Sequence, residues 1–284
     1  MNITTRNQLL YSQTAESCSR IVTHKYSTSF SLGIWMLHKS IRNAICAIYG
    51  FVRLADEIVD TFLENDQKTL LDRFKQDTYA AIEEGISLNP ILHNFQGVVR
   101  RYNIEKDLIE SFFTSMEMDL SYQVHSVDSY EEYIYGSAEV VGLMCLHVFT
   151  NGDQKHYDKL ADSAVSLGSA FQKVNFLRDM RQDSIELQRQ YFPQLQLSGF
   201  TKAAKKAIEE EIEQDFNKAY HGIMKLPIKA RLGVYLAYLY YWTLLQKIKM
   251  VSPEQISSVR IRVSNRRKCY LLFKALVLNK FNLL

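Results

Sequence analysis

The chain has 284 residues, of which 47% are hydrophobic and 23% are charged, and it contains 11 Gly and 4 Pro. This length fits one large domain or two small ones, and the apolar content suffices for a sizeable core. A net charge of +3 gives no support for a dedicated nucleic-acid binder, so we expect no nucleic-acid partner. Few chain breakers and long periodic segments predict an all-α fold, and no composition shift divides it, so we expect a single domain over residues 1–284.

The first half of the chain is expected to be a series of helices with short breaks. The polar stretch YSTSF, residues 26–30, predicts a turn or cap, because Ser and Thr compete with helical hydrogen bonds. Asn89-Pro90 marks a second break. The helix over 39–62 is apolar on nearly every face and should be central. The predicted helices are 7–25, 39–62, 67–85, 90–101 and 105–122.

The second half follows the same pattern. Asn151-Gly152-Asp153 ends one helix and Tyr191-Phe192-Pro193 ends another segment, while Pro227 and Pro253 stand at expected helix starts. The predicted helices are 128–150, 155–183, 201–223, 228–250 and 253–280.

The four cysteines have no paired spacing and fit reduced thiols in a cytosolic protein. The first residues are too polar for a signal peptide, and without an apolar run of about 18 residues we expect no transmembrane helix. We therefore expect a cytoplasmic protein, with a peripheral contact at the inner membrane left open.

Two acidic clusters stand out against these apolar helices. Asp56 and Asp60 are four residues apart in RLADEIVD, and Asn175, Asp179 and Asp183 follow at four-residue steps in QKVNFLRDMRQD. Residues four apart share a helix face, and like charges at that spacing cost a few tenths of a kcal/mol. Single pairs of this kind are mostly solvated surface charges. Two sets on apolar helices could instead face each other across a bundle and bind a cation.

Carboxylate and amide oxygens favour Mg²⁺, or Mn²⁺, as that cation. Mg²⁺ commonly shares its ligand positions with substrate phosphates. The nearby cations Arg53, Lys173, Arg178 and Arg189 fit a phosphate-bearing substrate, although each alone would be read as a salt bridge to a neighbouring acid.

The basic segment VRIRVSNRRK, residues 259–268, allows three interpretations: a solvated helix end, a diphosphate contact through Arg266, or a membrane-surface contact. His147 lies on an apolar helix and is expected to be a satisfied core histidine.

Several segments together resemble the phytoene/squalene synthase family, the head-to-head branch of the trans-isoprenyl diphosphate synthases. These segments are YSTSF, AIYGFVRLADEIVD, YIYGSAEVVG, FQKVNFLRDMRQD and RQYFP. Their order and spacing agree over almost the whole chain. Length and the residues around Glu139 are most similar to bacterial phytoene-forming members.

The resemblance implies an all-α isoprenoid-synthase bundle with a central cavity between the two aspartate motifs. It implies Asp56 and Asp60 as Mg²⁺-diphosphate ligands, with Asn175, Asp179 and Asp183 across the cavity. Further positions that match the family's site, or stand among its motifs and basic residues, are Ser27, Phe30, Tyr49, Arg53, Tyr133, Gln172, Arg178, Arg189 and Arg266. The aromatic residues Tyr49, Phe51, Tyr133 and Tyr135 are candidates for stabilising a carbocation.

Two positions depart from the family's pattern. Glu139 replaces a glycine that many relatives have, and it either lies outside the cavity on the opposite helix face or narrows the pocket. Arg181-Gln182 replaces the commoner Gly-Glu between Asp179 and Asp183, which leaves both aspartates in place.

The resemblance implies a Mg²⁺-dependent prenyltransferase that joins two prenyl diphosphates. Because no G-x-G-x-x-G fingerprint for a nicotinamide appears, we expect a non-reductive product: C40 phytoene from geranylgeranyl diphosphate. The alternative is a C30 product, dehydrosqualene or squalene, from farnesyl diphosphate. A non-catalytic assembly relative is less favoured, since such relatives typically lose the aspartates.

Overall fold

The computed structural model describes residues 3–121, 124–187, 189–193, 195 and 199–281. Within these ranges every regular element is a helix, and the β contact there is an isolated parallel bridge between Val124 and Gln190. This confirms the all-α prediction. The elements are α1 (Ile3–Tyr26), α2 (Thr28–Met36), α3 (Lys39–Asp60), α4 (Gln67–Glu84), α5 (Pro90–Tyr102), α6 (Lys106–Ser121), α7 (Val127–Ile134), the π-helical turn η1 (Tyr135–Glu139), α8 (Val140–Thr150), α9 (Gln154–Ile185), α11 (Lys202–Ile223), α12 (Ile228–Lys249), α13 (Pro253–Ile256) and α14 (Asn265–Lys280).

Polar caps set the helix starts. Asn89 accepts hydrogen bonds from the first backbone amides of α5, whose first residue is Pro90. Asp153 caps α9, Thr201 caps α11 and Ser264 caps α14 in the same way. Each such cap is worth about 0.5–2 kcal/mol. The turn and proline signals of the sequence therefore place the starts of α5 and α9 well, whereas the start of α14 was not predicted.

Three predicted elements differ from the structure. The break at YSTSF is confined to Ser27, which has extended backbone and caps α2 by accepting from the Phe30 amide, so the helix restarts at Thr28. The helix predicted over 128–150 contains η1. The helix predicted over 253–280 is two helices, because Ser264 is extended and caps a new start at Asn265.

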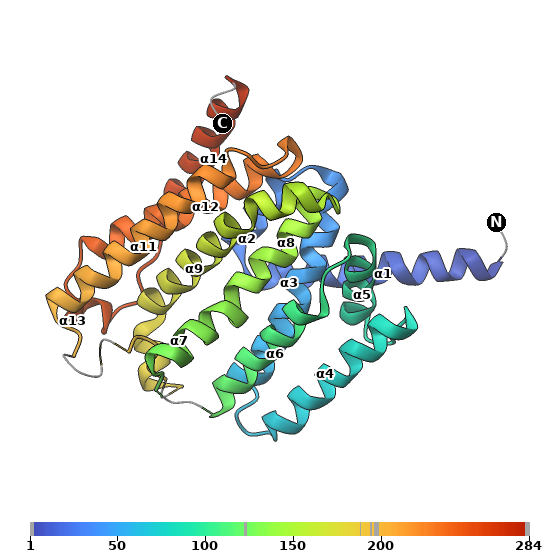
Figure 1. Cartoon of the computed structure of the whole chain (residues 1–284), viewed down its shortest axis with the longest axis horizontal. Helices are drawn as coiled ribbons and strands as arrows, with labels where there is room; N and C mark the ends of the chain where they lie inside the picture. Colours follow the sequence, from blue (N-terminus) through green and yellow to red (C-terminus); the bar gives the residue numbers. More distant parts are fainter. Residues whose placement is uncertain (1–2, 122–123, 188, 194, 196–198, 282–284) are drawn as a thin grey trace.

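The core consists of two apolar clusters. One cluster joins α3, α4, α5, α6 and α8, and it contains the stacked rings of Phe51 and Phe95, 4.0 Å apart. The other joins α7, α9, α11, α12 and α14. Figure 1 shows α9 between the α7–α8 pair and the α11–α12 pair, while the start of α1 extends away from the bundle. The cavity described below is lined from both clusters.

One segment in the described part of the chain, Val127–Thr150, is long and apolar enough to span a membrane by length and composition. Of its most apolar stretch, 61% is buried inside the bundle. Packing against α9 and α6 accounts for its apolar character, as expected for a core helix.

Candidate functional site

A cavity of about 480 Å³ lies between α2, α3, α8, α9, α11 and α12. Its lining changes character along α3 and α9. On α3 the lining runs from Ile45 to Asp56, and on α9 from Leu160 to Arg178. Both helices therefore pass from apolar to polar residues toward their C-terminal ends. The result is an apolar pocket with one polar end, which is the form expected for a long apolar molecule with a charged head.

On the α3 side, Asp56 lines the polar end. Tyr49, about two turns earlier, stacks on Phe30 of α2 with ring centroids 5.1 Å apart. Arg53 is ion-paired with Glu57 and lies 4.4 Å from the centre of the Tyr26 ring. The salt bridge thus holds Arg53 at the wall, with Tyr49 and Phe30 presenting an aromatic surface beside it.

On the α9 side, Gln172, Asn175 and Arg178 line the cavity. Arg178 Nε donates to both carboxylate oxygens of Asp179, at 3.0 Å each. Arg260, which comes from the segment between α13 and α14, also lines the cavity and pairs with Asp179 at 2.7 Å. Two arginines therefore compensate the charge of Asp179.

The electrostatics show that the two acidic sets lie close together. Burial raises the pKa of Asp183 to about 8, and the charges of Asp179 and Asp60 raise it as well. Burial likewise raises the pKa of Asp56 to about 7, with a further contribution from Asp60. Ionised carboxylates are thus crowded where water is scarce, and a cation would relieve that cost.

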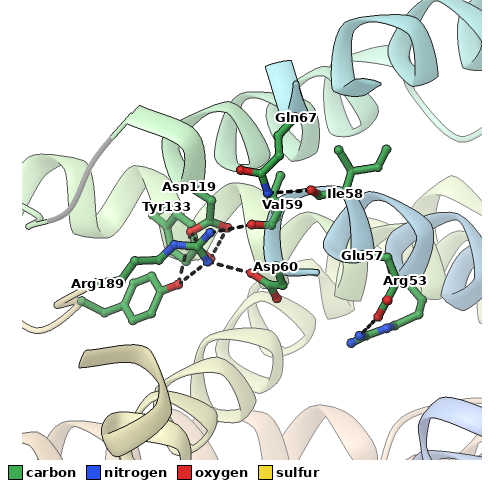
Figure 2. Close-up of polar contacts among 10 residues, drawn as sticks. Arg53, Glu57, Ile58, Val59, Asp60, Gln67, Asp119, Tyr133 and Arg189 are labelled. Atoms are coloured by element: carbon green, nitrogen blue, oxygen red, sulfur yellow. Dashed lines mark hydrogen bonds and ion pairs between the residues drawn. The ribbon is translucent and has the colours of Figure 1, made fainter. Parts of the chain in front are cut away.

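Arg189 contacts the acidic end of α3 and Asp119 of α6 (Figure 2). Its guanidinium is 7% exposed, pairs with Asp60 at 2.8 Å, and donates to the Val59 carbonyl at 3.0 Å. Its backbone amide donates to the Asp183 carbonyl at 2.8 Å. Asp119 of α6 lies 3.3 Å from the same guanidinium. Through its side chain and its backbone amide, this one residue therefore connects α3, α6 and the end of α9.

Asp119 is a buried carboxyl that the sequence analysis did not select. It accepts hydrogen bonds from Tyr133 at 2.9 Å and Tyr191 at 3.2 Å, and burial raises its pKa to about 7. A signal existed: Phe112, Met116 and Asp119 follow the 3–4-residue spacing of one helix face, and the first two are apolar. An acid on that face predicts a buried carboxyl with partners.

The predicted site residues fall into three groups. Eight line the cavity: Ser27, Phe30, Tyr49, Arg53, Asp56, Gln172, Asn175 and Arg178. Three acids, Asp60, Asp179 and Asp183, flank its polar end through the contacts above. Three residues are placed elsewhere: Tyr133, Arg189 and Arg266.

The residues placed elsewhere have clear surroundings. Tyr133 is buried beside Asp119, with its ring against Phe176 and Tyr191 rather than at the cavity wall. The guanidinium of Arg189 contacts the carboxylates of Asp60 and Asp119 and does not line the cavity. Arg266 is exposed at the start of α14, whereas Arg260 of the same basic segment lines the cavity.

Of the four aromatic candidates, only Tyr49 is among the described residues that line the cavity. Besides Tyr133, Phe51 is fully buried in the ring cluster around Phe95, and Tyr135 is 40% exposed. Tyr241, which the sequence analysis did not select, lines the cavity instead and stacks on Phe171 at 4.0 Å.

The oxygen donors at the polar end fit a hard divalent cation. Asn175 Oδ1 is buried and has no hydrogen-bond partner among the described residues, while the raised pKa values of Asp56 and Asp183 mark carboxyls whose charge Arg53 and Arg189 only partly compensate. In the described chain no three His, Cys, Asp or Glu side chains are already gathered around one point. Asp60 and Asp179 instead point to arginines.

Two further expectations were resolved. Glu139 is not among the described residues that line the cavity, and it contacts Ser169 on the far side of α9, which selects the first of its two interpretations. His147 is 3% exposed and shares a 2.6 Å hydrogen bond with Glu105, which confirms a satisfied core histidine.

The structure is similar to solved helical synthases over nearly its whole length. A dehydrosqualene synthase determined with a ligand has a TM-score of 0.79 and 21% identity, covering 95% of this chain and 98% of that one. The squalene synthase HpnC from Alicyclobacillus acidocaldarius has a TM-score of 0.74 and 18% identity, covering 84% of this chain and 95% of that one. The bundle and its polar-ended cavity thus define a helical isoprenoid-synthase fold.

The chain belongs to the squalene/phytoene synthase family, whose model matches residues 23–267. It is 30% identical to the 15-cis-phytoene synthase of Paracoccus sp. (strain N81106 / MBIC 01143) over 59% of this chain and 56% of that protein. It is also 30% identical to the phytoene synthase of Arthrospira platensis over 68% of this chain and 65% of that protein. The chain therefore spans less than two thirds of the length of these relatives. Members of the family are prenyltransferases that join isoprenoid units.

Proposed function

We propose that the chain condenses two molecules of geranylgeranyl diphosphate head to head into phytoene, with release of diphosphate, as a step of carotenoid biosynthesis. The observation that carries this is the cavity itself: an apolar pocket whose polar end combines Asp56, Asn175 and three arginines. Apolar walls suit the prenyl chain, and the polar end suits the diphosphate.

The arginines at that end supply charge for the leaving group. Arg53, Arg178 and Arg260 surround the place where a diphosphate would lie, and each can donate to its oxygens. As the C1–O bond of one substrate breaks, negative charge collects on the diphosphate, so these donors stabilise the transition state more than the ground state.

Mg²⁺, or Mn²⁺, is the cofactor that we propose, held by Asp56, Asp60, Asn175, Asp179 and Asp183. When bound, it would add charge stabilisation for the departing diphosphate. This assignment rests on the oxygen-only donor set and on the unpartnered Asn175 oxygen. Because Asp179 is paired with Arg178 and Arg260, loading must compete with an existing salt bridge.

The cavity walls protect the allylic cation that ionisation creates. The double bond of the second chain attacks this cation, and loss of one proton as the three-membered ring closes gives prephytoene diphosphate, a cyclopropyl compound. A second loss of diphosphate, rearrangement and loss of one proton give phytoene. Tyr49 and Phe30 form an aromatic pair next to the polar end, where a ring face can stabilise a cation by about 1 kcal/mol or more. Surrounding apolar residues keep water from trapping that cation.

A C30 product from farnesyl diphosphate is the second candidate. The 4,4'-diapophytoene synthase of Staphylococcus haemolyticus (strain JCSC1435) is 26% identical over 67% of this chain, a coverage close to that of the Arthrospira enzyme. Cytoplasmic placement, with a peripheral contact at the inner membrane when the apolar product leaves, remains part of the proposal.

The decisive experiment offers C15 and C20 diphosphates together with Mg²⁺ and identifies the hydrocarbon products. The proposal predicts mainly a C40 hydrocarbon, and its loss on addition of EDTA. A dominant C30 product would select the second candidate. Failure to consume either substrate would favour the non-catalytic assembly relative.

A further inference from the structure

A second buried charge cluster lies on the side of α9 opposite the cavity. Lys173 is 7% exposed and is ion-paired with Glu211 at 2.5 Å and Asp215 at 2.8 Å, both on α11. Ser169, one turn earlier on α9, donates to Asp215 at 3.3 Å. The cluster has no part in the proposed chemistry, because its side chains face away from the cavity.

Glu139, the last residue of the π-helical turn η1, joins this cluster. Its carboxylate form is favoured electrostatically by the Ser169 hydroxyl and the Lys173 ammonium, while Asp215 and Glu131 repel it. Tyr130 of α7 faces the same group from the side of Glu211 and Asp215. Burial raises the pKa of Glu139 to about 7. Burying an ionised carboxyl at this position costs free energy of folding. The position of Glu139 beside Lys173 and Ser169 therefore needs a structural or functional reason.

The turn η1 touches α9 and α6 at backbone distance. A Cβ added at Gly168 of α9 would lie 2.6 Å from the Ala138 carbonyl oxygen and 3.0 Å from the Glu139 Cα. A Cβ added at Gly136 would lie 2.4 Å from the Ser111 carbonyl oxygen. Because these contacts are between backbone atoms, no side chain can change its rotamer to absorb a movement of η1. A displacement of η1 therefore displaces the cavity wall.

The two residues before Glu139 form part of that wall. Ser137 and Ala138 line the cavity, and Gln172 Nε2 donates to Ser137 Oγ at 3.2 Å. Gln172 and Lys173 are neighbours on α9 and point to different sides. The turn is thus held on the cavity side by the hydrogen bond between Gln172 and Ser137, and on the far side by the attraction between Glu139 and Lys173. π-Helical turns are frequent at functional sites, which agrees with this position.

We propose that Glu139 is a positioning residue: by holding η1 against Ser169 and Lys173 it fixes the Ser137–Ala138 wall, and with it the choice between prenyl chains of different length. The inference rests on the proposed function for its substrates. It assigns a role to a residue that never contacts them.

The experiment compares Glu139→Ala and Glu139→Gln with the control Glu131→Ala, an exposed glutamate near the same cluster. Each variant receives equal C15 and C20 diphosphates. Glu139→Ala should change the ratio of C20 to C15 consumption by about fivefold or more, since one methylene more or less in an apolar pocket is worth about 10–200-fold in discrimination. Glu139→Gln keeps the shape and a polar group beside Ser169 and should stay within about twofold, as should the control.

Amide hydrogen exchange provides a second measurement that needs no turnover. Residues 136–142 should exchange about tenfold faster in Glu139→Ala than in wild type and Glu139→Gln, because the turn has lost its far-side contact. An unchanged substrate ratio in an active Glu139→Ala enzyme, with or without a lower Tm, would show a merely structural role. Unchanged exchange would overturn the positioning role whatever the activity, whereas a wild-type protein that consumes neither substrate refutes the proposed function and, with it, the specificity role.

Discussion

The four aspartates of the two motifs are not equivalent, although their spacing is the same on both helices. Asp60 and Asp179 are compensated by arginines, whereas Asp56 and Asp183 have raised pKa values, mainly because of burial and then because of neighbouring carboxylates. Each helix therefore carries one acid that is ion-paired with arginine and one acid that is only partly compensated. In the cation site that we propose, Asp56 and Asp183 would gain most from the cation, while Asp60 and Asp179 also stabilise the fold through their arginines.

The largest expected effect is on turnover. Asp56→Asn and Asp183→Asn should each lower turnover by about 10²–10³-fold or more, because each removes a proposed Mg²⁺ ligand and so weakens the charge stabilisation of the departing diphosphate. Helical circular dichroism should be unchanged, and the Tm at pH 8 without divalent ions should hold or rise, since a buried charge is gone. Activity within tenfold of wild type for both variants would remove these residues from the site.

Replacing an acid that is paired with a buried arginine should lower the free energy of unfolding more than replacing an acid in a surface ion pair. Asp60→Asn leaves the buried Arg189 guanidinium with one carboxylate fewer, so we expect a loss of about 1–3 kcal/mol in unfolding free energy. Asp72→Asn is the matched control, because Asp72 is exposed and pairs with Lys68 one turn away on α4. That control should lose less than about 0.5 kcal/mol. Equal losses in denaturant titrations of the two variants would contradict the comparison.

Stability should also fall with rising pH when divalent ions are removed. The folded pKa values of Asp56, Asp119 and Asp183 lie near 7 to 8, above the ordinary value of 3.8, so the folded state binds more protons between those limits. The unfolding free energy should therefore decrease from pH 5 to 8, by about 2–4 kcal/mol after allowance for coupling between the groups.

Adding divalent cations tests whether the pH-dependent loss of stability comes from the carboxyls at the proposed cation site. Mg²⁺ should reduce the loss at pH 8, and Asp56→Asn should reduce it without Mg²⁺. A pH-independent Tm over this range in EDTA would show that the acids are compensated by other means.

The smallest effect concerns Arg260. Removing its charge in Arg260→Met should tighten Mg²⁺ binding without substrate by about threefold to tenfold, because one competitor for Asp179 is lost. The KM for the prenyl diphosphate should rise in the same variant, since a donor to its oxygens is gone. Calorimetric titration with Mg²⁺ measures the first effect; weaker binding would show that Arg260 supports the site instead of competing.

Much of this could be predicted from local signals. Asn89-Pro90 and Thr201 gave helix starts because their capping chemistry acts within three residues. The aspartate spacing placed both acidic sets correctly on α3 and α9 because one helix face is a local property.

The predictions that failed concern features set by packing between segments that are distant in the sequence. Phe51 and Tyr49 are two residues apart on an apolar helix, yet one enters the ring cluster of Phe95 and the other lines the cavity. No spacing distinguishes Arg260 from Arg266, since their difference arises from the non-helical stretch that ends at Ser264. The turn η1 left no sequence signal that we can identify.

Arg189 gives the polar end of the cavity a specific vulnerability. It belongs to the connection between α9 and α11, and through its side chain and its backbone it reaches Asp60 and Asp183 at once. An insertion or deletion in this connection would change the distance between Asp60 and Asp183 while the apolar part of the cavity stayed unchanged. Under the function that we propose, such a protein should still bind prenyl alcohols but no longer ionise their diphosphates, so the length of this connection constrains the site as strictly as the residues that line the cavity.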